Sequence, residues 1–124
     1  MSQVFILSVA AALGANARYW IGDILARRLG TSFPFGTLVI NLSGSLLLGL
    51  FLALFTDRFL LDPRWRMVFT VGFLGSYTTF STYTFESVNL MLTGQWGLGL
   101  LNLLGSSILG AIAALLGVWL GKVV

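Results

Sequence analysis

The sequence contains no cysteine and no histidine in its 124 residues, and only 9% of the residues are charged. The chain therefore forms no disulfide, and it lacks the usual protein ligands of zinc and haem and the commonest acid–base catalyst. Soluble domains carry about 25% charged residues, whereas this chain is 57% hydrophobic and has a mean hydropathy of +0.95. We expect an all-α integral membrane protein that is not an enzyme.

The hydrophobic residues fall into four runs separated by short polar breaks, and each run reaches the roughly 20 residues that a transmembrane helix needs. Asp62 and Pro63 are typical of an N-cap and a first helical position, and they precede the third run. The extreme N-terminus has no basic residue, so we expect no cleaved signal peptide. We predict a single domain, residues 1–124, with spans at 3–25, 35–56, 65–92 and 97–121.

The third predicted span contains a run of hydroxyl side chains, because eight of the nine residues from 76 to 84 are Ser, Thr or Tyr. Irregular backbone is accepted at membrane depth only where protein buries it or a water-filled cavity meets it. Gly72 and Gly75 precede several β-branched threonines and weaken the helix beside this run. We predict a broken helix near the bilayer centre, serving passage of something small and polar. The alternative is a straight helix whose hydroxyls bond back to the preceding turn.

The basic residues are scattered between the predicted helices, which indicates anchors beside anionic lipid and no nucleic-acid site. Their division between the two sides of the membrane is weak: one side has Arg27 and Arg28, and the other has Arg58, Arg64, Arg66 and Lys122. Such a small bias barely fixes the orientation under the positive-inside rule. Insertion in both directions, followed by antiparallel pairing into a dimer, is therefore physically reasonable.

Two helix faces carry stripes of polar and small residues at a spacing of four. These are Asn41, Ser45, Gly49 and Ala53 in the second span, and Asn102, Ser106, Gly110 and Ala114 in the fourth. Small residues at this spacing let membrane helices pack closely, so helix packing and an ion path both stay open for Ser45 and Ser106. For Asn41 and Asn102 we favour a polar cavity, because a buried carboxamide must find several partners.

Three charged residues lie within or near the spans, and we expect Asp23, which is near a helix end, at the membrane interface. Arg18 either snorkels to the membrane interface or attracts anions at a vestibule. Glu86 pairs with Arg18 or another polar group, or meets water at a pore mouth. The aromatic residues of the third span have positive ring edges, which could solvate a dehydrated anion in the weak, repeated sites that conduction requires. Hydroxyls serve cations and anions equally, so these residues alone do not choose the ion.

Three motifs taken together are specific. They are Gly14-x-x-x-Arg18-Tyr19, Gly36-Thr37-Leu38-x-x-Asn41-x-x-Gly44, and Gly72-Phe73-x-Gly75-x-x-Thr78-Thr79-Phe80-Ser81-Thr82. On these residues the chain closely resembles the bacterial fluoride channels of the Fluc (CrcB) family over essentially its whole length. The resemblance implies a fluoride-selective channel that exports fluoride passively and relieves its toxicity. It also implies an antiparallel, dual-topology homodimer with two pores in the bacterial inner (cytoplasmic) membrane.

The same resemblance implies the site residues. A structural sodium ion at the dimer interface would be held by backbone carbonyls of Gly75 and Thr78. The fluoride pore would be lined by Asn41, Phe80, Ser81, Thr82, Tyr83, Asn102 and Ser106, with Arg18 at the vestibule and Glu86 possible at a pore mouth. Tyr83 departs from the usual phenylalanine, and Asn102 and Gly110 alter two of the three aligned polar-track positions of the fourth helix.

Two other functions compete with this interpretation. A proton-coupled small multidrug exporter is also a dual-topology four-helix dimer, but it needs a membrane-embedded carboxylate in its first helix. Here the first helix has Arg18 and no acidic residue before Asp23. The other candidate for the membrane-embedded carboxylate is Glu86 in the third span. A non-transporting membrane subunit would use the polar stripes for helix association alone, and it would tolerate Asn41→Leu without loss of phenotype.

Overall fold

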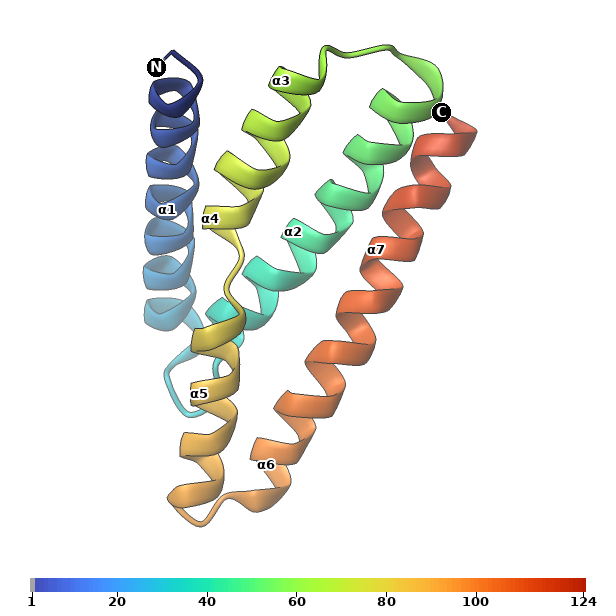
Figure 1. The fold of residues 1–124 in the computed structure, drawn as a ribbon. Helices are drawn as coiled ribbons and strands as arrows, with labels where there is room; N and C mark the ends of the chain where they lie inside the picture. Colours follow the sequence, from blue (N-terminus) through green and yellow to red (C-terminus); the bar gives the residue numbers. More distant parts are fainter. Residues whose placement is uncertain (1) are drawn as a thin grey trace.

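The computed structural model describes residues 2–124, and Met1 lies outside the described residues. In this range the chain is helical and forms four rods joined by short connections, as Figure 1 shows. The first rod is α1 (Ser2–Leu29), and the second is α2 (Phe35–Ala53), which continues into a π-helical turn, η1 (Leu54–Arg58). Successive rods run in opposite directions, so the start of α1 and the C-terminus lie at the same end of the molecule.

The third rod is built from several pieces: α3 (Pro63–Met67), the π-helical η2 (Val68–Leu74), α4 (Gly75–Tyr77) and α5 (Phe80–Leu92). Asp62 is the N-cap of α3, and its Oδ1 accepts a hydrogen bond from the backbone N–H of Arg64 at 2.8 Å. Pro63 follows in the first turn, where its missing N–H costs nothing. The predicted N-cap at Asp62 and first helical position at Pro63 are confirmed, and the helix begins two residues before the predicted span.

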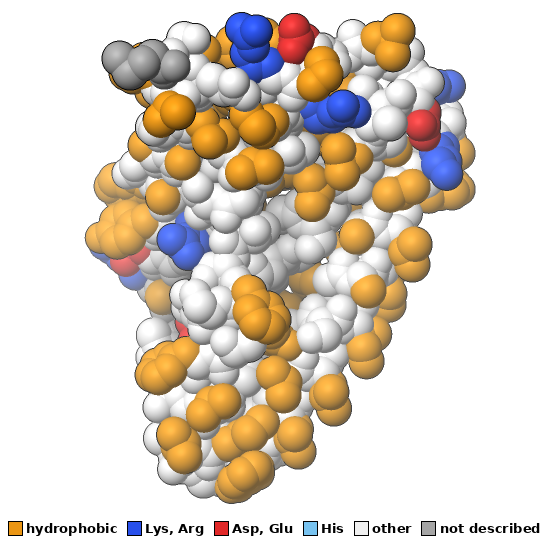
Figure 2. All heavy atoms as spheres, viewed as in Figure 1, with side chains coloured by type: hydrophobic (Ala, Val, Ile, Leu, Met, Phe, Trp, Pro, Cys, Tyr) orange, Lys and Arg blue, Asp and Glu red, His pale blue; other side chains and the backbone are white. Residues whose placement is uncertain are grey.

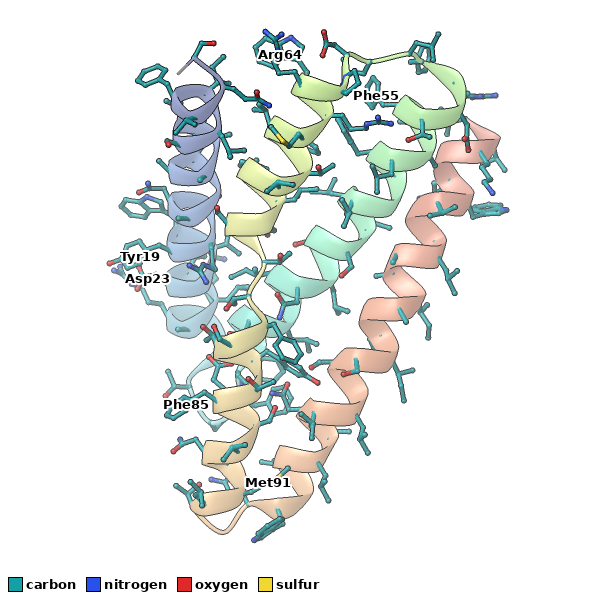
Figure 3. All side chains as sticks on the ribbon, in the orientation of Figure 1. Tyr19, Asp23, Phe55, Arg64, Phe85 and Met91 are labelled. Atoms are coloured by element: carbon teal, nitrogen blue, oxygen red, sulfur yellow. The ribbon has the colours of Figure 1, made fainter. Side chains whose placement is uncertain are left out.

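A tight turn leads to the fourth rod, which comprises α6 (Trp96–Leu100), the π-helical η3 (Leu101–Gly105) and α7 (Ser106–Val123). Gly94 makes this turn possible because its φ of +86° is a conformation that other residues rarely adopt. Figure 3 places Met91 of the third rod beside this turn, and Arg64 at the opposite end of the third rod.

Three segments are long and apolar enough to cross a membrane: Ser2–Leu29, Phe35–Arg58 and Trp96–Val123. The third rod is interrupted at Thr78 and Thr79, and α5 alone has 13 residues, fewer than the roughly 20 that a span requires. Hydrophobic side chains cover much of the surface in Figure 2, including the length of the fourth rod. Such a surface suits contact with lipid.

Glycines let the helices approach closely. A Cβ added to Gly14 of α1 would overlap the backbone carbonyl oxygen of Phe73 in η2. On the α2–α7 contact, a Cβ on Gly49 would meet the carbonyl oxygen of Ala114 in the same way. Gly49 of the first predicted stripe and Ala114 of the second therefore serve helix packing.

Candidate functional site: two polar grooves beside an interrupted helix

Two residues of extended backbone separate α4 from α5. Thr78 has φ −81° and ψ 159°, and Thr79 has φ −149° and ψ 116°. The side chain of Asn41 on α2 pairs with this backbone: its Nδ2 donates to Thr79 O at 3.0 Å, and its Oδ1 accepts from Thr79 N at 2.8 Å. One carboxamide thus satisfies both the N–H and the carbonyl of Thr79.

Several hydroxyls of the run also bond to nearby groups of the third rod. Thr79 caps α5 because its Oγ1 accepts from the backbone N–H of Thr82 at 3.3 Å. Thr78 Oγ1 donates to Leu74 O at 2.9 Å, and Thr84 Oγ1 donates to Phe80 O at 3.1 Å. Part of the hydroxyl run is therefore used to build the two helix ends.

A groove of about 470 Å³ lies between the interruption and the facing sides of α2 and α7. Figure 2 shows a recess near the centre of the drawn face, where most exposed atoms belong to the backbone or to side chains that are neither charged nor hydrophobic. Six of the predicted site residues line this first groove: Asn41, Gly75, Thr78, Phe80, Tyr83 and Ser106. Ser45, Ser107 and Gly110 line it as well. Ser81 and Thr82 are exposed on α5 and do not line it.

Phe80 and Tyr83 form an aromatic pair at the edge of this groove. Their ring centroids are 5.9 Å apart, with the planes tilted by 57°. Phe80 is 76% exposed, whereas Tyr83 is 7% exposed. The Tyr83 hydroxyl bonds to the carbonyl oxygen of Leu103 and lies 2.7 Å from Ser107 Oγ. The extra hydroxyl of this tyrosine therefore binds the fourth rod.

Asn102 does not line the first groove and is 2% exposed. Its Nδ2 donates to Ser87 Oγ at 2.9 Å, and its Oδ1 accepts from Ser106 Oγ at 2.9 Å. Ser87 is fully buried and donates in turn to Tyr83 O at 2.8 Å. Ser87 is a site residue that was not predicted from the sequence. Its only sequence signal is its place one helical turn after Tyr83.

A second groove of about 470 Å³ is lined by the three charged residues considered in the sequence, Arg18, Asp23 and Glu86. Glu86 Oε1 accepts a hydrogen bond from Thr37 Oγ1 at 3.0 Å, and Oε2 is buried without a partner among the described residues. Within residues 2–124 the one ion pair joins Arg27 to Asp23 at 2.9 Å. Glu86 thus pairs with a hydroxyl, and Arg18 shares its groove without contacting it as an ion pair.

Comparison with known proteins identifies the family of the chain. Residues 5–118 match the family model described as CrcB-like protein, Camphor Resistance (CrcB). The chain belongs to the CrcB family. A relative from Koribacter versatilis is 48% identical over 111 residues, covering 90% of this chain and 87% of its own. A relative from Magnetococcus marinus is 42% identical over 122 residues, covering 98% of this chain and 99% of its own. A third, from Maridesulfovibrio salexigens, is 40% identical over 124 residues, covering 100% and 98%.

Each of these three CrcB relatives carries the name "Fluoride-specific ion channel FluC". The resemblance noted in the motifs is confirmed by the family match. The chain is a multi-pass membrane protein, because three of its segments are long and apolar enough to cross a membrane and because these relatives in its family are named ion channels.

Proposed function

We propose that this CrcB-family chain is a fluoride-selective ion channel that exports fluoride passively and so relieves its toxicity. The observation that carries the proposal is the near-complete alignment with relatives named fluoride-specific ion channels at 40–48% identity. The first groove supports it, because amide, hydroxyl and aromatic groups meet there beside an interrupted helix. Several weak donors along a path suit conduction better than one tight binding site.

The proposed channel is an antiparallel, dual-topology homodimer with two pores in the bacterial inner membrane. A single chain leaves the first groove open on one side, and Phe80 is 76% exposed beside it. A second copy would cover this aromatic surface and complete the wall of the path. The exposed Ser81 and Thr82 then belong to the fluoride path through contact with the second copy.

The third rod crosses the membrane as a broken helix in this proposal, with Thr78 and Thr79 near the bilayer centre. Unpaired backbone groups in hydrocarbon each cost several kcal/mol. Asn41 removes this cost for Thr79 by pairing with both its N–H and its carbonyl. The interruption is therefore compatible with membrane depth.

Backbone carbonyls near the interruption fit a hard cation such as sodium. A continuous helix would direct the N–H of Thr79 to Gly75 O and the N–H of Thr82 to Thr78 O. Here the Thr79 N–H donates to Asn41 and the Thr82 N–H donates to Thr79 Oγ1. Gly75 and Thr78, both lining the first groove, can therefore offer carbonyl oxygens to a structural Na⁺ at the dimer interface. When bound, the cation offsets the cost of bringing an anion into a low-dielectric region.

The second groove is the proposed vestibule. Arg18 supplies positive charge that attracts fluoride, while Glu86 and Thr37 form a hydrogen-bonded pair at the pore mouth. Asn102 is proposed to act on the path through Ser106, because the two side chains are hydrogen-bonded.

A fluoride-sensitive bacterium that lacks its own fluoride exporter tests the physiological role. Expression of the unchanged chain is expected to restore growth in medium containing fluoride, and an Asn41→Leu variant with normal membrane expression is expected not to. Failure of the unchanged chain to restore growth, despite normal membrane expression, would favour a non-transporting membrane subunit. Resistance to cationic dyes that depends on a proton gradient and on Glu86 would instead favour a multidrug exporter.

A further inference from the structure

Ser45 on α2 lines the first groove opposite a residue without a side chain. A Cβ added to Gly110 of α7 would lie 3.9 Å from Ser45 Oγ, with no other atom within 4 Å besides its own helix and chain neighbours. The space across from the Ser45 hydroxyl therefore has room for a methyl group without a clash. Asn41 precedes Ser45 by four residues, so the two side chains follow each other on the same face of α2.

The direction of each proton in the neighbouring network can be worked out from its acceptors. Ser87 Oγ lies 2.8 Å from the Tyr83 carbonyl oxygen, which can only accept, so Ser87 donates its one proton there. Ser87 must then accept from Asn102 Nδ2, which turns Asn102 Oδ1 toward Ser106. Ser106 consequently donates to Asn102 and offers the groove its lone pairs, which repel an anion.

The hydroxyls of Tyr83 and Ser107 are also occupied. Ser107 Oγ donates to Leu103 O at 2.8 Å, the carbonyl to which the Tyr83 hydroxyl bonds as well. The two hydroxyls lie 2.7 Å apart, so their protons are shared among these three groups. The α7 side of the first groove therefore has hydroxyls but no free hydroxyl proton.

Ser45 differs from these residues because its hydroxyl makes no hydrogen bond within residues 2–124, although it lies in an α-helix. Asn41 likewise keeps one amide hydrogen, because Nδ2 carries two and Thr79 O takes one. We propose that Ser45 is a fluoride-contacting residue, whose Oγ–H donates to the ion one helical turn beyond Asn41. This inference rests on the proposed channel function. It names Ser45, and not Ser106, as the hydroxyl donor of the α2–α7 wall.

Fluoride efflux from liposomes that contain purified protein tests the inference with four variants beside the unchanged chain. Ser45→Ala is expected to slow efflux by about tenfold, the effect of losing one hydrogen bond to a charged group. Ser106→Ala is expected to slow it less than Ser45→Ala does. The Ser45→Ala/Gly110→Ser double variant returns a hydroxyl to the same space from α7, and it should recover most of the lost rate. Ser8→Ala, on the exposed side of α1, is the matched control and should conduct normally.

The outcomes separate the two claims. Equal efflux from the unchanged chain and Ser45→Ala would overturn the role of Ser45 and leave the channel function in place. A Ser45→Ala defect that Gly110→Ser does not relieve would overturn it too, provided that the double variant elutes as the unchanged protein does. If Ser45→Ala alone does not assemble, the double variant decides. No fluoride efflux from the unchanged chain would overturn the proposed function and this inference with it.

Discussion

Asn41 and Thr79, separated by 38 positions in the sequence, are joined by two hydrogen bonds between the Asn41 carboxamide and the Thr79 backbone. The pair connects α2 to the interruption of the third rod. It stabilises extended backbone where a continuous helix would otherwise form, and it holds the carboxamide on the wall of the first groove. One side chain thus determines both the shape and the polarity of the candidate path.

Replacing Asn41 by aspartate should destabilise the protein. The side chain keeps its size, but an acceptor oxygen replaces the Nδ2 donor and faces the Thr79 carbonyl oxygen. A buried polar group that loses its partner costs about 1–3 kcal/mol of the free energy of unfolding. Thermal unfolding in detergent measures this change. A melting temperature equal to that of the unchanged protein would contradict the structural role of Asn41.

Phe80→Ile is expected to abolish fluoride flux while the protein still assembles. Isoleucine keeps apolar volume but removes the positive ring edge. Phe85→Ile is a matched control, because Phe85 is also exposed on α5, and Figure 3 shows its ring directed away from the fourth rod. Flux from Phe80→Ile equal to that of the control would remove Phe80 from the path.

Gly14→Ala is expected to lower the stability of the folded protein by about 1–3 kcal/mol, the usual cost of overpacking a close contact. The added Cβ would overlap the carbonyl oxygen of Phe73, and backbone cannot move aside as a flexible side chain can. Gly97→Ala is the control, since nothing lies within 4 Å of its added Cβ. Unfolding temperatures in detergent that do not differ between the two variants would mean that α1 and η2 pack less closely than described.

The sodium proposal predicts different behaviour for two variants of Thr78. Proline removes the N–H that donates to Leu74 O at 3.0 Å and forces the preceding Tyr77 out of helical backbone, so the nearby carbonyls move. Glycine keeps the carbonyl and the N–H. Replacing Na⁺ by a large organic cation should lower the melting temperature of the unchanged protein and of Thr78→Gly, but not that of Thr78→Pro. An identical response of both variants would place the cation elsewhere.

The N-cap of the third rod was predictable from the sequence, because a local signal determines it, whereas α1 continues to Leu29, beyond the predicted end at residue 25. Asp62 and Pro63 act within one turn of α3. The interruption itself lies at Thr78 and Thr79, beyond the two glycines that drew attention to this region, and Gly75 is helical. Its position depends on Asn41, a partner distant in sequence, and no local pattern contains that information.

The candidate site was predictable as a set of residue types but not as a set of contacts. Glu86 pairs with Thr37, and Asn102 is buried against Ser87, because the fold brings together helices whose relative rotation the sequence does not state. Ser87 lacked any spacing signal beyond an ordinary helical position. The three family motifs, in contrast, were specific enough to give the family without the structure.

The most direct test of the account reconstitutes the purified, unchanged protein in liposomes loaded with fluoride or with chloride, and follows anion efflux with an ion-selective electrode. The account predicts rapid passive loss of fluoride, without a proton gradient, while chloride is retained. Retention of fluoride in vesicles that contain the folded, assembled protein would contradict it, and so would equal loss of both anions.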